Sequence, residues 1–249
     1  MVLAAWQAAG AGVGAGTTVV VIRSPKILLA AVDSRETWVE YRGGIVSSEQ
    51  RSICKARKIG PFYALVAGTA RGTNGFNALD EVAKAYNAGL GINELAGRVR
   101  DSMPAVLGRL LDSVRESNPE EYTRRYAGQT ALQIVIAGVE AGVTRSAVVE
   151  FFEDRTGSAM SARMRMCPGE CSGLVSTVFL GIHGEIDALV ARDNAMLLRP
   201  AAGLAESLIA VESAAHPDVV GGPVSIVKFD KSGGQMVQGG ACAIEGDDR

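Results

Sequence analysis

Two short runs of apolar residues near the start of the chain predict a buried β-hairpin. Val19 to Ile22 and Ile27 to Val32 are rich in β-branched side chains, with Pro25 between them. Neither run alternates between apolar and polar positions, so we expect both faces of the hairpin to be covered. A hairpin centred on Pro25 sets Thr17 directly opposite Asp33, with both side chains on one face.

The apolar pattern of the following residues predicts a second hairpin and then two helices. Residues 53–68 read as a hairpin that turns at Gly60-Pro61. From Asn77 the apolar spacing becomes helical, with Gly89 as the expected stop. A longer apolar stripe from residue 95 to residue 114 predicts a second helix, with a kink at Pro104.

The rest of the chain returns to strand composition and then to helices. Strands are expected within 130–142, 145–154 and 174–184, helices near 186–195 and 203–214, and a closing hairpin within 223–239. This order of elements predicts an α+β fold in which two antiparallel sheets pack face to face with helices outside each, a four-layer αββα sandwich. No linker or repeat divides residues 17–249, which we expect to form a single domain.

Composition and charge agree with one globular domain and exclude some classes of partner. A chain of 249 residues with 47% hydrophobic residues can bury one large core. Its net charge is −2, and basic and acidic residues are mixed along the sequence. Because no basic stripe is present to bind a phosphate backbone, we do not expect nucleic acid as a partner.

The first 16 residues are expected to be a leader or propeptide. No charged side chain occurs before Arg23, but glycines at alternate positions from Gly10 to Gly16 disfavour a helix, so no stable membrane span is expected. A secretory signal, a propeptide and the remainder of a longer leader all stay open, and so do an exported or periplasmic and a cytoplasmic location. The segment GAGVGAG precedes a strand rather than following one, which excludes a dinucleotide-binding loop.

The cysteines and histidines indicate neither a metal site nor a catalytic triad. Four cysteines are too few for a disulfide framework, and the pair in CPGEC lacks the spacing of a zinc site, so no metal or cofactor is expected; a disulfide there would fit an exported protein. His183 and His216 are the only histidines, and neither lies near a nucleophile elbow. A Ser-His-Asp triad is therefore not expected.

Thr17 and Asp33 form the first candidate site. Asp33 ends an apolar strand, where an unpaired carboxylate is costly, and a lysine from residues 53–58 would neutralise it. A hydroxyl and a carboxylate would then share one site. The alternative is that these two residues merely mark strand ends.

Several short motifs resemble the β-type subunits of the proteasome and their bacterial relatives, which are N-terminal-nucleophile hydrolases. The motifs are Gly16-Thr17-Thr18, Asp33-Ser34-Arg35, Lys55 and AGTA at 67–70. In that family the mature chain begins with threonine, and Thr17, Asp33 and Arg35 match the family spacing without a gap. Lys55 matches the catalytic lysine, although the loop before it is about six residues longer here, and Gly68 matches the glycine whose N–H forms the oxyanion hole.

The resemblance extends to the C-terminal part of the chain, with two departures. Asp218 resembles the aspartate that precedes Ser-Gly-Gly in the family. The serine expected after it is Gly221, and no counterpart of the family's small Ser-Gly-Ser segment is found. Lys58 is a second possible lysine, but the spacing to the Pro at position 61 favours Lys55.

The resemblance also implies a substrate preference. Ile53, Val66 and Ala70 match the residues that shape the first specificity pocket of the family. Because none of the three is charged, the resemblance implies a preference for apolar side chains before the cut bond.

The activity implied by the resemblance is that of an N-terminal threonine amidohydrolase, with a peptide or another amide as substrate and a possible homo-oligomeric assembly. Cleavage between Gly16 and Thr17 would free an amine that serves as the base for the Thr17 hydroxyl. Lys55 and Asp33 would support it, and the Gly68 N–H would stabilise the oxyanion. The alternative is an inactive, unprocessed subunit of the same fold that serves assembly or binding.

Overall fold

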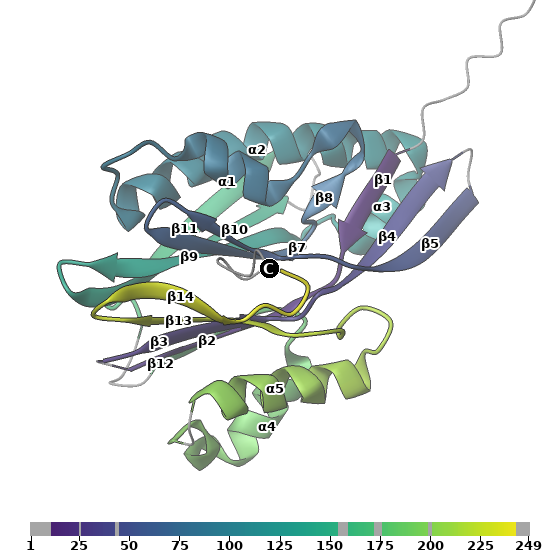
Figure 1. Ribbon diagram of the computed structural model, residues 1–249. Coiled ribbons are helices and arrows are strands. Elements are labelled where there is room, and N and C mark those ends of the chain that lie inside the picture. Colours follow the sequence, from purple (N-terminus) through teal and green to yellow (C-terminus); the bar gives the residue numbers. More distant parts are fainter. Residues whose placement is uncertain are drawn as a thin grey trace, which may run out of the picture.

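The computed structural model describes residues 11–24, 26–42, 45–153, 159–171, 176–198 and 201–242. Its strands form three antiparallel sheets (Figure 1). Residues 1–10 of the expected leader lie outside the described residues. Among the helices that are described, none is both long enough and apolar enough to cross a membrane.

One five-stranded sheet contains the N-terminal hairpin, and we call it the β2–β3 sheet. Its strands are, in spatial order, β12 (Ser176–Gly181), β2 (Thr18–Arg23), β3 (Leu28–Val32), β13 (Ser225–Asp230) and β14 (Gly233–Gln238). Every residue of β2 and β3 is buried, as the unbroken apolar runs predict. One face packs on the next sheet, and the other is covered by α4 (Gly184–Arg192) and α5 (Ala201–Ala215).

The register of the N-terminal hairpin differs from the predicted one by one residue. The turn closes with the Ser24 N–H donating to the Ile27 carbonyl (2.8 Å), so the loop is shorter than a hairpin centred on Pro25 requires. Val19 then pairs with Val32, and the Asp33 N–H donates to the Thr18 carbonyl (3.4 Å). Asp33 therefore lies opposite Thr18, and the predicted pairing with Thr17 is wrong.

The second five-stranded sheet, which we call the β7–β9 sheet, carries the second hairpin. Its strands are, in spatial order, β11 (Met160–Cys167), β10 (Val143–Glu153), β9 (Thr130–Glu140), β7 (Phe62–Gly68) and β6 (Ala56–Ile59). Ile59 pairs with Phe62 across Gly60-Pro61, which confirms the predicted turn. Strand β11 was not predicted, because its exposed positions alternate with methionine and alanine rather than with β-branched residues.

Helices α1 (Ala78–Ala85) and α2 (Ile92–Ser117) cover the outer face of the β7–β9 sheet, and the short α3 (Pro119–Arg125) follows them. The predicted apolar stripe of α2 is buried, and the helix continues through Pro104. Helix α1 begins after Asn77, whose side chain accepts the Leu79 N–H, and it ends at Ala85 rather than at Gly89. Two 3₁₀ turns complete the described helices, Thr73–Gly75 and Asn194–Leu198.

The third sheet has four strands and overturns the predicted fold class. Its spatial order is β5 (Ile45–Ser52), β4 (Arg35–Arg42), β1 (Ala11–Ala15) and β8 (Arg71–Gly72). The prediction of a four-layer αββα sandwich with two sheets is therefore wrong, and the structure is a strand-rich mixed fold with three antiparallel sheets. The apolar pattern did not predict this sheet because β5 is exposed almost throughout. Its strand conformation comes from pairing with β4 rather than from burial of an apolar face.

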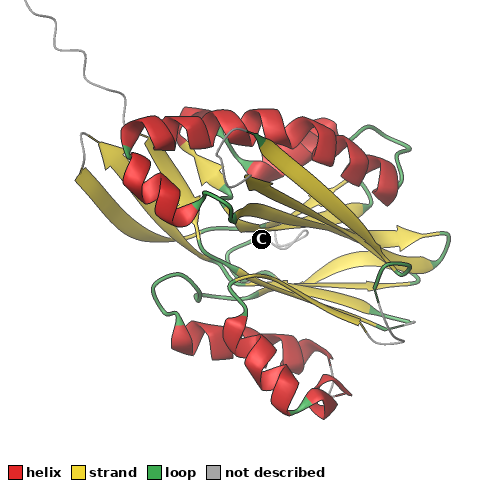
Figure 2. Ribbon diagram, turned by 180° about the vertical axis from the view of Figure 1, so that it is seen from behind, coloured by secondary structure: helices red, strands yellow, loops and turns green. Residues whose placement is uncertain are grey.

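The three sheets lie between two groups of helices. Figure 1 shows α1 and α2 on one side of the molecule, α4 and α5 on the other, and β1, β4 and β5 extending to one end. The view from behind in Figure 2 shows the same arrangement. The chain passes from the β2–β3 sheet into the four-stranded sheet at Asp33 and Ser34, between β3 and β4. That crossing point is where the candidate site lies.

All four cysteines are paired in two disulfides. Cys54 is bonded to Cys242, and Cys167 is bonded to Cys171. The second pair lies in the CPGEC segment, where the sequence predicted no zinc site and left a disulfide open for an exported protein. The first pair ties the residue before Lys55 to the C-terminal segment after β14, across a sequence separation of 188 residues.

We expect Cys54→Ser to lower the free energy of unfolding by about 3 to 5 kcal/mol, because the broken crosslink closes a very long loop in the unfolded chain. Urea unfolding under non-oxidising and non-reducing conditions measures the loss. Cys167→Ser is the matched control and should cost less, because its loop is short. Equal losses in the two variants would contradict this interpretation.

Candidate active site

Thr17 lies at the junction between β1 and β2 and is 1% exposed. Its carbonyl accepts a hydrogen bond from the Ile182 N–H (2.9 Å). A Cβ atom at Gly181 would overlap that carbonyl, so only glycine allows β12 to approach Thr17 this closely. The backbone of Thr17 is therefore fixed by residues at the C-terminal end of β12.

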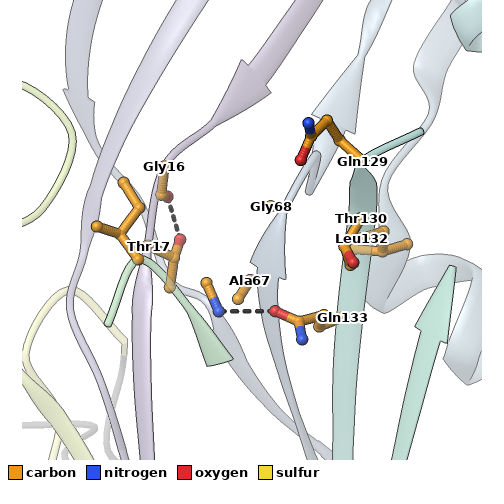
Figure 3. Close-up of a pocket in the computed structure, with 10 residues that line it drawn as sticks. Gly16, Thr17, Ala67, Gly68, Gln129, Thr130, Leu132 and Gln133 are labelled. Carbon is orange, nitrogen blue, oxygen red and sulfur yellow. Dashed lines mark hydrogen bonds between the residues drawn. The ribbon is translucent and has the colours of Figure 1, made fainter. Parts of the chain in front are cut away.

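The Thr17 hydroxyl points back at the peptide bond that precedes it. Its Oγ1 donates a hydrogen bond to the Gly16 carbonyl oxygen (Figure 3). Gly16 has a φ of +91°, and a Cβ atom there would lie 2.6 Å from the Val219 carbonyl oxygen. Because other residues rarely adopt this conformation, glycine at position 16 is required by the backbone itself.

Asp33 is fully buried and accepts three backbone hydrogen bonds. Oδ1 accepts the Thr18 N–H (2.9 Å), and Oδ2 accepts the N–H groups of Gly221 (2.9 Å) and Arg35 (3.1 Å). Gly221 is the residue that stands where the resemblance implies a serine. At this position the chain contributes a backbone donor that holds the Asp33 carboxylate.

Lys55 joins Asp33 to the Gly16–Thr17 bond. Its Nζ lies 3.5 Å from Asp33 Oδ1 and donates to the carbonyl oxygens of Gly16 (2.8 Å) and Arg35. The lysine side chain is 1% exposed. The ammonium group is thus placed at the oxygen on which negative charge would develop if the Gly16 carbonyl were attacked.

Burial and ion pairing act in opposite directions on the two charged groups. Burial lowers the pKa of Lys55 to about 8, and the negative charge of Asp33 opposes that shift. Burial raises the pKa of Asp33, and the Lys55 ammonium and the three backbone donors oppose it. Each charge is therefore tolerated in the interior because the other is present.

Arg35 positions a loop of the site. Its guanidinium donates to the carbonyl oxygens of Pro217 and Val220 (3.4 Å), which holds the segment that presents Gly221 to Asp33. Asp218 lies on the same segment, but its side chain is exposed. Its backbone carbonyl accepts a hydrogen bond from Thr37 Oγ1 (2.6 Å), so Asp218 contributes to the loop through its backbone.

A cavity of about 310 Å³ opens beside Thr17 (Figure 3). Gly68 lies on its wall with a φ of +88°, and a Cβ atom there would lie 2.5 Å from the Ala131 carbonyl oxygen. Gln133 spans the far side, where its Oε1 accepts the Gly181 N–H and its Nε2 donates to Glu150 Oε1, both at 2.7 Å. The residues that line the cavity are Gly16, Thr17, Ala67, Gly68, Gln129, Thr130, Leu132, Gln133, Gly181 and Ile182.

Sequence reasoning missed the part of this wall that comes from β9 and from the end of β12. Gly181 carries a weak signal, since it is a glycine at the point where a strand gives way to a helix. Gln133 and Ile182 carry none, because each is one residue within an ordinary strand or turn pattern.

The three residues expected to form a specificity pocket lie elsewhere. Val66 and Ala70 are buried in the core beneath α1 and α2. Ile53 is partly exposed, and its N–H donates to the Ser34 carbonyl (2.9 Å). The described cavity beside Thr17 is lined by other residues. The preference for apolar side chains at the first position stays a prediction.

The residues before Thr17 form a strand inside the four-stranded sheet. β1 pairs with β4, with Ala15 opposite Thr37, and with β8, with Gly14 opposite Arg71. Ala11 and Val13 are buried against the core beneath α2. The glycine-rich segment is therefore an extended strand that leads directly into the candidate site.

Comparisons of the chain with models of protein families and with curated proteins give no match. What the molecule itself offers for a functional assignment is a buried hydroxyl, an ammonium group and a carboxylate around one peptide bond, with a cavity beside them.

Proposed function

We propose that the protein is an N-terminal threonine amidohydrolase, acting on peptides, whose nucleophile is the Thr17 hydroxyl after the Gly16–Thr17 bond has been cut. One observation carries the proposal. Lys55 Nζ lies 2.8 Å from the Gly16 carbonyl oxygen and 3.5 Å from Asp33, while the Thr17 hydroxyl contacts the same carbonyl oxygen. A structural lysine needs an acidic partner, but it does not need to be aimed at the peptide bond before a buried threonine.

The first step is self-cleavage. The Thr17 Oγ1 adds to the carbonyl carbon of Gly16, and the charge that develops on the carbonyl oxygen is stabilised by the Lys55 ammonium. The bond from that carbon to the Thr17 nitrogen then breaks, and the hydroxyl proton moves to the nitrogen. This leaves an ester to the hydroxyl and a free amine, and water hydrolyses the ester to release residues 1–16.

Turnover uses the Thr17 amine that self-cleavage sets free, together with Lys55 and Gly68. An α-amine has an ordinary pKa of about 7.7 to 8.0, so the freed Thr17 amine can take the hydroxyl proton near neutral pH. Lys55 remains beside it as a cation, held by Asp33. Gly68 lines the cavity beside Thr17, and its N–H is our candidate for the second oxyanion donor.

Loss of the leader opens a place for a peptide substrate. β1 occupies a slot between β4 and β8, and a peptide in extended conformation would pair with the same two strands. In the register of β1, its scissile carbonyl would stand where that of Gly16 now stands. We infer that the leader marks the path of the substrate.

A second candidate function is a subunit that keeps its leader and serves assembly or binding. It is favoured by the pairing of β1 on both edges and by the burial of Ala11 and Val13, since both make the leader part of the fold. The two candidates differ on whether the Gly16–Thr17 bond is cut.

Chains released from a removable N-terminal fusion test the proposal. A chain that begins at Thr17 should hydrolyse a fluorogenic peptide. A chain that begins at Gly16 should be inactive for as long as its intact mass shows that Gly16 is still attached, because the Thr17 nitrogen is then an amide without basicity. The two chains differ by a single glycine, so stability is matched. Equal activity in both, with Gly16 still attached to the second chain, would rule out the Thr17 amine as the base.

A further inference from the structure

The two faces of β1 meet very different surroundings. Ala11 and Val13 point into the apolar core. Because side chains alternate along a strand, Gly12 and Gly14 face the opposite side of β1. They are the fifth and third residues before the Gly16–Thr17 bond.

An ion pair lies across β1 at Gly14. Gly14 stands opposite Trp38 on β4 and opposite Arg71 on β8. The guanidinium of Arg71 binds both carboxylate oxygens of Glu36, at 3.2 and 3.0 Å. A Cβ atom at Gly14 would overlap the Glu36 carboxylate. Since Glu36 is 1% exposed and held by two hydrogen bonds, it cannot swing aside without losing its partner.

At Gly12, the ring of Trp38 leaves no space for a side chain, as the Glu36 carboxylate does at Gly14. A Cβ atom there would lie 2.8 Å from Trp38 Cζ2 and 3.1 Å from Thr73 Cγ2. The Trp38 ring is held in place by its Nε1, which donates to Glu40 (3.1 Å), and by the Arg51 guanidinium, 4.9 Å from the ring centroid. A rigid aromatic ring therefore covers the slot two residues beyond the ion pair.

We propose that the slot selects peptides with glycine at the third and fifth positions before the cut bond and a small apolar residue between them, with the Glu36–Arg71 ion pair and Trp38 as the selecting groups. This substrate class rests on the proposed function, because it assumes that substrates follow the path of the leader. The walls come from β4 and β8, so they remain when residues 1–16 are released. Selection then acts by exclusion of a side chain rather than by a pocket that receives one.

The leader itself provides the first test, in the full chain carrying Thr17→Ala so that residues 1–16 stay attached. Gly14→Ala and Gly12→Ala should each increase hydrogen exchange in residues 11–15 about tenfold or more, since overpacking displaces the strand. Adding Glu36→Ala should restore slow hydrogen exchange to the Gly14→Ala chain but not to the Gly12→Ala chain. Adding Trp38→Ala should restore it to the Gly12→Ala chain but not to the Gly14→Ala chain. Glu36→Asp, which is one methylene shorter, replaces Glu36→Ala if that variant fails to fold.

The second test uses wild-type protein that has released its leader. The probes are the peptide AGVGAGTVV and its analogues with alanine or leucine at the third or fifth position before the Gly-Thr bond. Affinity is measured by calorimetry, and kcat/KM by chromatography. Each added side chain should weaken binding about tenfold to a hundredfold, while serine in place of the alanine at the second position should have a small effect.

The outcomes separate the inference from the proposed function. Binding with the expected discrimination but no hydrolysis would leave the slot assignment standing and count against the amidohydrolase. Hydrolysis with equal rates for glycine, alanine and leucine at the third position would overturn the slot assignment and leave the amidohydrolase standing. The slot assignment would also be overturned if no peptide bound. It would be overturned as well if Glu36→Ala and Trp38→Ala each restored slow exchange to both glycine variants or to neither.

Discussion

The full chain with Thr17→Ala is expected to keep residues 1–16 and to hydrolyse no peptide, whereas the wild type is expected to lose those residues. Alanine has no hydroxyl to attack the Gly16 carbonyl, so neither self-cleavage nor turnover can begin. Thr17→Ser keeps the hydroxyl and should still be processed. Intact mass after expression in the cytoplasm, together with a fluorogenic peptide assay, measures both effects.

Thr18→Ala is the matched control for this first prediction. Thr18 is the buried neighbour of Thr17, and its hydroxyl donates to the Ile182 carbonyl (2.5 Å). Its loss should cost about 1 kcal/mol of stability and leave processing intact. A Thr17→Ala chain that is shortened at the same bond would show that another protease makes the cut. Turnover by a chain that retains residues 1–16 would remove Thr17 from the mechanism.

The second large effect concerns Lys55 and Asp33, which we expect to act as one unit. In a chain that begins at Thr17, Lys55→Ala and Asp33→Ala should each lower kcat/KM about a hundredfold to a thousandfold. Either change leaves a buried charge without its partner, which should also lower the free energy of unfolding by about 3 to 5 kcal/mol. The double variant should be little worse than either single one, since the first change already disables the pair.

Steady-state kinetics and urea unfolding of the two single variants and the double variant measure this coupling. Asp33→Asn keeps the shape of the side chain and separates loss of charge from loss of packing. Lys58→Ala is the control, because Lys58 belongs to the same segment but is exposed. Activity losses that multiply in the double variant would show that Lys55 and Asp33 act independently.

The sequence predicted best those elements whose cause is local. Gly60-Pro61 reverses the chain because its residues suit a turn, and β6 and β7 pair around it as expected. The closing hairpin of β13 and β14 and the buried stripe of α2 follow equally from nearby residues. In each case the pattern and the structure depend on contacts within a few turns or one hairpin.

Register and sheet membership depend on more than the local pattern. The turn at residues 24–27 closes one residue tighter than a hairpin centred on Pro25, which moves Asp33 opposite Thr18. β5 has no apolar face and becomes a strand only because β4 pairs with it. Both features are set by backbone hydrogen bonds. Because these bonds depend little on the type of side chain, the sequence pattern does not predict them.

The candidate site divides in the same way. The residue pattern indicated Thr17, Asp33 and a lysine of residues 53–58, the resemblance chose Lys55 among them, and the ammonium and carboxylate groups do form a buried ion pair. Tertiary structure alone decided what holds them: Gly221 donates to Asp33 from 188 positions away, and Ile182 N–H binds the Thr17 carbonyl. These contacts use backbone N–H groups, which every residue except proline carries, so no residue type in the sequence announces them.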